Sequence, residues 1–166
     1  MLTLASGPIH AVIDPASGAR LLSLKVDGNE LIPDHDQRDP DFLRGSFPLA
    51  PWCGVLPESD HPGLAGTMHG LVHSSPWTVT QTCPTRVTLE TWIGPGTPRP
   101  WLGSGRLQLD YELDDQSLTM RLGITAVEGG WPAALGFHPW FRRRLEGHSG
   151  AARYAYSPQA RLILVD

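Results

Sequence analysis

Two histidines in unusual surroundings are the residues of this sequence best suited to chemistry. His69 stands in the segment GTMHG at 66–70, and His138 stands in GFHPWF at 136–141. The glycine after His69 lets a ligand or another backbone approach closely, whereas the proline after His138 restricts that histidine to an extended backbone. An unperturbed imidazole titrates near pH ~6.5, so both side chains can exchange protons at neutral pH. The pattern predicts a polar acid–base site on a rigid scaffold.

Three tryptophans accompany these motifs and extend the interpretation to a ligand class. Trp52 and Trp77 flank the first histidine segment, and Trp140 follows His138 by two positions. Aromatic rings beside polar groups suit a sugar, which has apolar C–H faces and a rim of hydroxyls. The three tryptophans are therefore candidate substrate-binding residues. Tryptophans of an all-β core would give the same composition, so packing stays open as the alternative.

Other chemistries fit the sequence less well. His69 and His73 are four positions apart, a zinc-ligand spacing on a helix, but the glycine, serines and proline around them disfavour a helix. No third ligand is marked, and the serine-hydrolase pattern G-x-S-x-G is absent. Cys53 and Cys83 lack CxxC spacing and are expected to be ordinary thiols. A zinc site is therefore a minor alternative.

Composition limits the class of protein. The chain has 166 residues, with 40% hydrophobic and 18% charged residues, which predicts one globular domain over residues 1–166. A net charge of −4 without a basic stripe disfavours a nucleic-acid partner. No apolar run is long enough to span a bilayer, and the first residues do not resemble a signal peptide. We therefore expect no membrane association and a cytoplasmic location.

The elements that must position the histidines are predicted to be strands. Apolar and polar residues alternate over 87–93, 107–113 and 118–124, which is typical of strands with one buried face. Turn residues at 114–116 join the last two of these strands into a hairpin. Near the N-terminus, a first strand is predicted at 9–13, and Asp27-Gly28 predicts a tight turn between strands at 19–26 and 30–32. The stretches 33–45 and 57–68 are rich in helix and strand breakers, as expected of site-forming loops or of a floppy insertion. Because no helical period occurs, the predicted fold is an all-β antiparallel sandwich.

Four segments, in the correct order, resemble the aldose 1-epimerase (galactose mutarotase) family. They are GARLLSLKVDGNEL at 18–31, GSFPLAPW at 45–52, MHGLV at 68–72 followed by WTV at 77–79, and ALGFHPWF at 134–141. The resemblance implies a galactose mutarotase-like β-sandwich. It covers most of this chain but only the N-terminal part of the family's domain, so we expect a domain that is incomplete at its C-terminus.

The resemblance also implies an activity and roles for the two histidines. The family interconverts the α and β anomers of a free aldose by opening and reclosing the sugar ring, without a cofactor. By resemblance, His138 would be the general acid at the ring oxygen, and His69 would hydrogen-bond the sugar near that oxygen. An aldohexose is accordingly the expected small-molecule ligand.

Two departures from the family pattern favour an alternative. Where the family carries an Asn-Arg pair after PLAPW, this chain reads Cys53-Gly54-Val55, so a sugar-binding arginine is replaced. The last residues, 164–166, resemble the start of a further segment of the family. The family's sugar-binding aspartate and its glutamate base come after that segment. A non-catalytic carbohydrate-binding or regulatory module is therefore the alternative function. Absent strands would leave a sheet edge exposed, which leaves three alternatives: the chain forms a homodimer through that edge, it is a fragment, or its sandwich closes differently.

Overall fold

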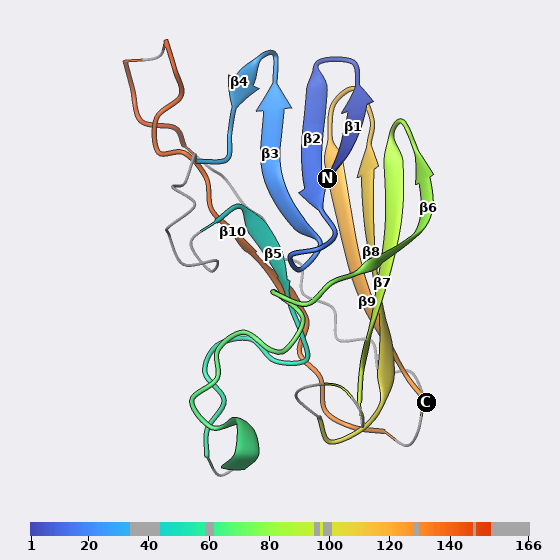
Figure 1. Ribbon diagram of the computed structural model, residues 1–166. Helices are drawn as coiled ribbons and strands as arrows, with labels where there is room; N and C mark the ends of the chain where they lie inside the picture. Colours follow the sequence, from blue (N-terminus) through green and yellow to red (C-terminus); the bar gives the residue numbers. More distant parts are fainter. Residues whose placement is uncertain are drawn as a thin grey trace.

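Two antiparallel sheets pack face to face in the computed structural model (Figure 1), which describes residues 1–33, 44–58, 62–94, 97, 101–127, 130–147 and 149–153. The first sheet has the order β1-β2-β3-β5-β10, with β4 paired to β3, and the second has the order β6-β7-β8-β9. The strands of the first sheet are β1 (Leu2–Ser6), β2 (Ile9–Asp14), β3 (Arg20–Val26), β4 (Asn29–Glu30), β5 (Ser46–Leu49) and β10 (Gly136–Pro139). Those of the second are β6 (Thr78–Cys83), β7 (Arg86–Ile93), β8 (Gly105–Leu113) and β9 (Leu118–Ala126). One 3-10 turn, η2 (Pro62–Leu64), interrupts the connection from β5 to β6.

The second sheet follows the alternation of its sequence. In β8 the side chains of Leu107 and Leu109 are fully buried, whereas the intervening Arg106 and Gln108 face outward. The register places Leu109 opposite Leu89 of β7 and opposite a leucine of β9, so apolar residues line one face across the strands. Because successive side chains of a strand point to opposite faces, this row can only face the other sheet. The predicted strands and the hairpin between β8 and β9 are confirmed.

The core lies between the two sheets. Ala11 and Ile13 of β2 belong to the same core cluster as Val87 and Leu107 of the second sheet, and all four are fully buried. Each large aliphatic side chain buried in this way stabilises the fold by about 1.5–3 kcal/mol. The buried hydroxyl of Tyr111 in β8 donates a hydrogen bond of 2.7 Å to the carbonyl oxygen of residue 19, which ties the sheets together. The predicted all-β antiparallel sandwich is confirmed.

The first sheet departs from the sequence prediction in its short strands. The tight turn at Asp27-Gly28 is confirmed, with φ of 50° and 78°, but β4 is only two residues long. β1 precedes the predicted first strand, and β5 and β10 form within the segments singled out for their chemistry. β5 and β10 have four residues each and pair with each other from distant parts of the chain, so neither shows a period of its own. Much of the predicted loop 33–45, and the end at 164–166, lie outside the described residues.

The outer face of the first sheet is the face that carries the histidines. Ser46 pairs with Leu21, a core residue, so the next residue, Phe47, points away from the core. Phe47 is fully buried but does not belong to the main core cluster. His138 is its register partner in β10. The long connection from β5 to β6, which leaves the sheets at the lower left of Figure 1, returns across this face through His73.

No helix within the described ranges has the length and apolar character needed to cross a membrane.

Candidate functional site

The fold brings His69 and His138 into direct contact. Their ring centroids are 5.0 Å apart, and the ring planes are inclined at 70°, an edge-to-face arrangement. His138 comes from β10, whereas His69 lies in the β5–β6 connection, between two isolated bridges that pair Ala50 with Gly70 and Val55 with Met68. The two histidines singled out by the sequence therefore lie together, on the outer face of the first sheet.

The backbone of residue 54 fixes the ring of His69. The amide of His69 donates to the carbonyl oxygen of Gly54 at 2.8 Å, and the amide of Gly54 donates to Nδ1 of His69 at 3.2 Å. Because Nδ1 accepts a hydrogen bond, the neutral ring carries its proton on Nε2. His69 also adopts a left-handed backbone with φ of 64°, which is uncommon for a residue other than glycine. The hydrogen bond from Gly54 therefore orients the imidazole so that its Nε2–H group, the hydrogen-bond donor, points away from Gly54.

The surroundings of His69 keep it neutral. Burial lowers the pKa of its imidazole below the usual value, and the neighbouring charge of His138 lowers that pKa further. Both causes disfavour a second cation in the pair. At neutral pH His69 is thus a hydrogen-bond donor rather than an acid.

Ring contacts surround His138. Its imidazole stacks on Phe47 with centroids 5.0 Å apart and planes 7° from parallel, and Trp140 lies on it at 5.3 Å and 34°. Nδ1 is buried and finds no hydrogen-bond partner within the described part of the chain. Only Nε2 of His138 can therefore reach a ligand.

The three predicted tryptophans have different environments. Trp52 is 6% exposed, packs against Trp101 with ring centroids 4.9 Å apart and planes inclined at 32°, and donates its indole N–H to the carbonyl of residue 67. Trp77 is 4% exposed and donates to the carbonyl of residue 72. Both indoles are buried and present no ring face to a ligand, as expected if these two tryptophans serve to pack the interior. Trp140, which is 36% exposed and contacts His138, is the predicted tryptophan that borders the site.

Two residues that the sequence analysis did not select support the site. Phe47 contacts three imidazoles, those of His69, His73 and His138, at centroid distances of 6.4, 5.8 and 5.0 Å. Arg20 of β3 is 1% exposed and places its guanidinium carbon 4.5 Å from the centroid of Phe47. Phe47 lies in a segment that marked the family resemblance, and Arg20 is a charged residue at the start of an apolar strand. Neither signal by itself indicates a contact with a histidine.

Val55, which follows the PLAPW segment, is an exposed residue. Val55 is 57% exposed and pairs with Met68, directly before His69. No carboxylate within the described residues hydrogen-bonds to either His69 or His138. Nor do any three His, Cys, Asp or Glu side chains in those residues gather closely enough to hold a metal ion. The described site consists of imidazoles and aromatic rings.

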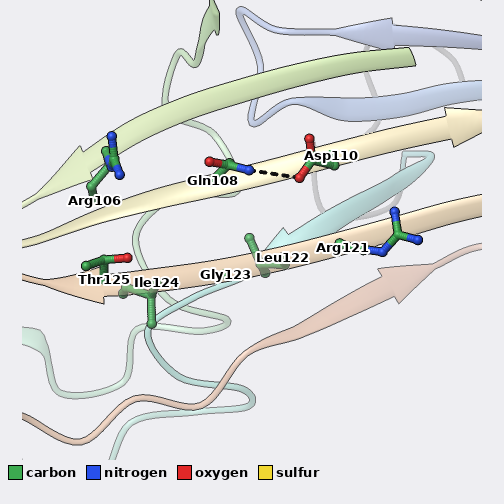
Figure 2. A pocket seen from close by; sticks show the side chains of 8 residues that line it. All are labelled: Arg106, Gln108, Asp110, Arg121, Leu122, Gly123, Ile124 and Thr125. Carbon is green, nitrogen blue, oxygen red and sulfur yellow. Dashed lines mark hydrogen bonds between the residues drawn. The ribbon is translucent and has the colours of Figure 1, made fainter. Parts of the chain in front are cut away.

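Two hollows on the described surface lie elsewhere. One of about 300 Å³ covers the outer face of β8 and β9, with Arg106 and Thr125 at one end and Asp110 and Arg121 toward the other (Figure 2). Another of about 480 Å³ lies over β2 and β3, beside Lys25. Neither hollow is lined by His69, His73 or His138, and the shape of a hollow does not by itself indicate a reaction.

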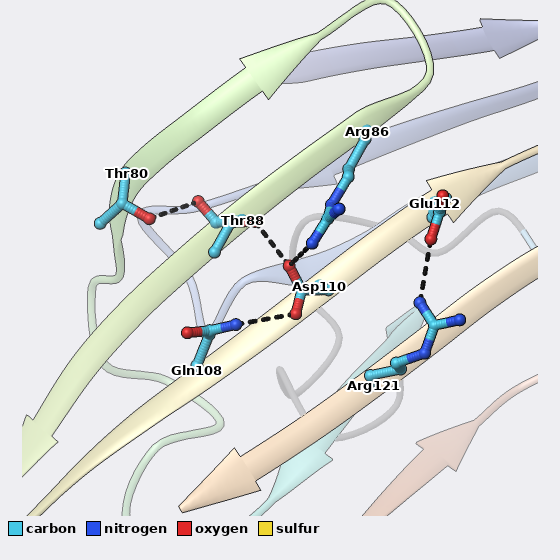
Figure 3. Close-up of polar contacts among 7 residues, drawn as sticks. All are labelled: Thr80, Arg86, Thr88, Gln108, Asp110, Glu112 and Arg121. Carbon is cyan, nitrogen blue, oxygen red and sulfur yellow. Dashed lines mark hydrogen bonds and ion pairs between the residues drawn. The ribbon is translucent and has the colours of Figure 1, made fainter.

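Polar groups of the first hollow already bond to one another (Figure 3). Asp110 accepts hydrogen bonds from Thr88 at 2.5 Å, Gln108 at 2.9 Å and Arg86 at 3.1 Å. Burial raises the pKa of Asp110, but these three hydrogen bonds and the charge of Arg86 outweigh it, and the pKa is lowered overall. This network stabilises an outward-facing carboxylate, whereas Nε2 of the paired histidines remains available. We therefore place the candidate site at the histidines.

The fold and this site place the chain among the galactose mutarotase-like β-sandwiches. A galactose mutarotase-like protein from Lactobacillus casei superposes with a TM-score of 0.73 at 23% identity, over 86% of this chain and 50% of that one. A Synechocystis protein matches with a TM-score of 0.73 at 26% identity, over 86% and 54%. A galactose mutarotase related enzyme from Lactobacillus acidophilus matches with a TM-score of 0.69 at 19% identity, over 85% and 48%.

The chain belongs to the aldose 1-epimerase family, whose sequence model matches residues 2–153. No curated protein matches the chain. The chain spans about half the length of the solved structures that it resembles.

Proposed function

We propose that this chain acts on a free aldohexose as an aldose 1-epimerase, interconverting its α and β anomers. The observation that carries the proposal is the contact between His69 and His138, whose centroids lie 5.0 Å apart in a member of the aldose 1-epimerase family. One imidazole is held neutral with a defined donor, and the other has a single nitrogen available. Such a pair can donate two different hydrogen bonds to neighbouring oxygens of one sugar.

The two Nε2 atoms have different roles in this chemistry. Protonated Nε2 of His138 gives its proton to the ring oxygen as the bond between that oxygen and the anomeric carbon breaks. The anomeric hydroxyl loses its proton, and its oxygen becomes the carbonyl of the open-chain aldehyde. Nε2–H of His69 hydrogen-bonds the sugar near the ring oxygen. Rotation about the bond next to the aldehyde, followed by the reverse proton transfers, closes the ring to either anomer.

Two features determine how fast this chain should work. A positioned general acid typically contributes ~10²–10⁴-fold, and the Trp140 ring, which contacts His138, would stack on a sugar face. The described residues hold no carboxylate on the histidine pair, so water would accept the anomeric proton. We therefore expect mutarotation above the buffer rate but slower than with a built-in base.

Polarimetry or NMR of freshly dissolved α-galactose and α-glucose tests this proposal. Wild-type protein should speed equilibration, and His138→Gln should remove that acceleration because the acid is lost. His10→Gln, which changes an exposed histidine on β2, is the matched control and should behave like the wild type. A folded wild-type protein that leaves the rate at the buffer value would overturn the catalytic proposal.

Sugar binding without turnover is the second candidate. It is favoured by Val55, which stands where the family carries an arginine and has no hydrogen bond to offer. Titration with aldoses followed by NMR would then shift the imidazole signals of His69 and His138 without faster equilibration. If neither shifts nor acceleration occur at millimolar sugar, both candidates fail.

We also propose that two copies pair through β9. This strand is the end of the second sheet, and its inward side chains Leu122 and Ile124 are only partly buried although those of β8 are fully covered. Light scattering after size exclusion should give twice the chain mass. Ile124→Lys should give the monomer mass, and a monomeric wild-type protein would contradict the pairing.

A further inference from the structure

His138 lacks the contact that usually orients a reactive histidine. In most such residues one ring nitrogen bonds to a carboxylate or a carbonyl, and this bond fixes both the tautomer and the ring plane. Nδ1 of His138 is buried, yet no group of the described chain accepts from it or donates to it. The plane of the imidazole must therefore be set by the rings that pack against it.

Phe47 is the ring best placed to set that plane. It is the register partner of His138 on the neighbouring strand, and the two rings stack within 7° of parallel. Phe47 is fully buried, so it cannot turn without displacing its neighbours. Trp140, on the same strand as His138, is inclined at 34° and partly exposed, which makes it the weaker constraint.

Arg20 in turn holds Phe47. Its guanidinium carbon is 4.5 Å from the ring centroid, a cation–π contact that is strengthened by near-complete burial. Nη1 donates to the carbonyl of Arg44 at 2.5 Å, and Nη2 donates to the carbonyl of His73 at 2.9 Å. The guanidinium thus joins β3, the residues just before β5 and the loop after His69 around one aromatic ring.

We propose that Phe47, backed by Arg20, is the positioning residue that holds the imidazole plane of His138 so that Nε2 points at the ring oxygen of the sugar. The direction toward a sugar rests on the proposed function, but the orientation of the ring does not. A residue that only filled space would change the stability of the protein and leave the geometry of the imidazole unchanged. The two roles are therefore separable by spectroscopy.

NMR of the histidine side chains tests the orientation without any need for activity. In the wild type, NOEs from the Cε1 proton of His138 to the rings of His69 and Trp140 report the orientation of the imidazole plane, and the His138 signal is assigned with His138→Gln. Phe47→Leu keeps an apolar side chain but removes the ring, so the imidazole should turn and these NOEs should change in a folded protein. Loss of the Phe47 ring-current shift alone is expected in either role, so unchanged NOEs to His69 and Trp140 in folded Phe47→Leu would overturn the proposal.

The Arg20 variants provide the second arm. Arg20→Met removes the cation and should move the His138 signal part of the way, while Arg20→Lys, which keeps a cation over the ring, should restore it. Arg106→Met is the matched control, since that arginine is exposed on the second sheet. If Arg20→Met and Arg106→Met leave the signal equally unchanged, Arg20 has no part in positioning. If Arg20→Met does not fold, Arg20→Gln takes its place in the comparison, with Arg106→Gln as its control and the same two outcomes.

Kinetics then link the orientation to function. Because a small misplacement of a reacting group can cost up to about 10²-fold in rate, Phe47→Leu should lower kcat at least about tenfold and leave KM within about twofold. An increase in KM alone would contradict positioning and indicate a lost sugar contact. A wild-type protein that does not accelerate mutarotation would refute the proposed function, whereas the NMR result on His138 would stand on its own.

Discussion

Replacement of Gly70 by alanine tests how the loop places His69. Gly70 has a φ of 82°, and a Cβ atom there would lie 1.9 Å from the carbonyl oxygen of Ala50. The backbone must therefore move, which breaks the hydrogen bond of 2.7 Å from the Leu71 amide to that oxygen. The left-handed conformation costs about 1 kcal/mol for alanine, and the lost buried hydrogen bond costs about 1–3 kcal/mol. We expect the free energy of unfolding to fall by about 3 kcal/mol.

The matched control is Gly28→Ala in the tight turn between β3 and β4. Gly28 has a similar φ of 78°, but an added Cβ meets nothing within 4 Å, so only the conformational cost of about 1 kcal/mol applies. Urea unfolding of both variants isolates the steric part, and NMR of the His69 imidazole reports its displacement. Equal losses of stability in the two variants, or an unchanged His69 signal in Gly70→Ala, would refute the reasoning.

Three further predictions concern charge and pH. His138→Gln should raise the pKa of His69, because the charge of His138 is one of the two causes that lower it; an NMR titration measures this, and an unchanged pKa would contradict the coupling. Since the folded-state pKa of His69 is lowered, its stabilising contribution is present above the unfolded pKa of about 6.5 and is lost as pH falls through the folded value. The stability of the wild type, measured in urea between about pH 7.5 and pH 5, should therefore fall more than that of His69→Asn, in which asparagine tolerates the left-handed backbone; equal slopes would rule this out. Asp110→Asn should lower the free energy of unfolding by about 1–3 kcal/mol because it disturbs a buried carboxylate that accepts from three donors. The control Glu112→Gln breaks an exposed ion pair and should cost less than about 1 kcal/mol. Similar losses of stability in the two variants would contradict the importance of burial.

The strands of the second sheet could be predicted because their information is local. The alternation around Leu107 and Leu109 records which side chains face the core, and every strand of that sheet pairs with its neighbour in the chain. The turn at Asp27-Gly28 was likewise predictable, since few residues tolerate two successive positive φ values. β5 and β10 were not predicted, because each is only four residues long and acquires its partner from a distant part of the chain.

Prediction of the site was uneven for the same reason. The residue types and flanking glycine and proline indicated His69 and His138, and the structure brings these two together. For the tryptophans, residue type could not distinguish a buried indole from one beside the site, and only Trp140 contacts the pair. Nothing in the local sequence around Arg20 indicates that its cation lies over an aromatic ring.

The sequence by itself determined the all-β class, the family and the identity of the two imidazoles, because these depend on residue type and on spacing along one segment. Tertiary structure decided how those imidazoles differ. His69 is kept neutral by burial and by a neighbour from another strand, and His138 is oriented by stacking on Phe47. Burial, ring contact and charge coupling depend on which distant segments meet in space, and here they meet on the outer face of one sheet.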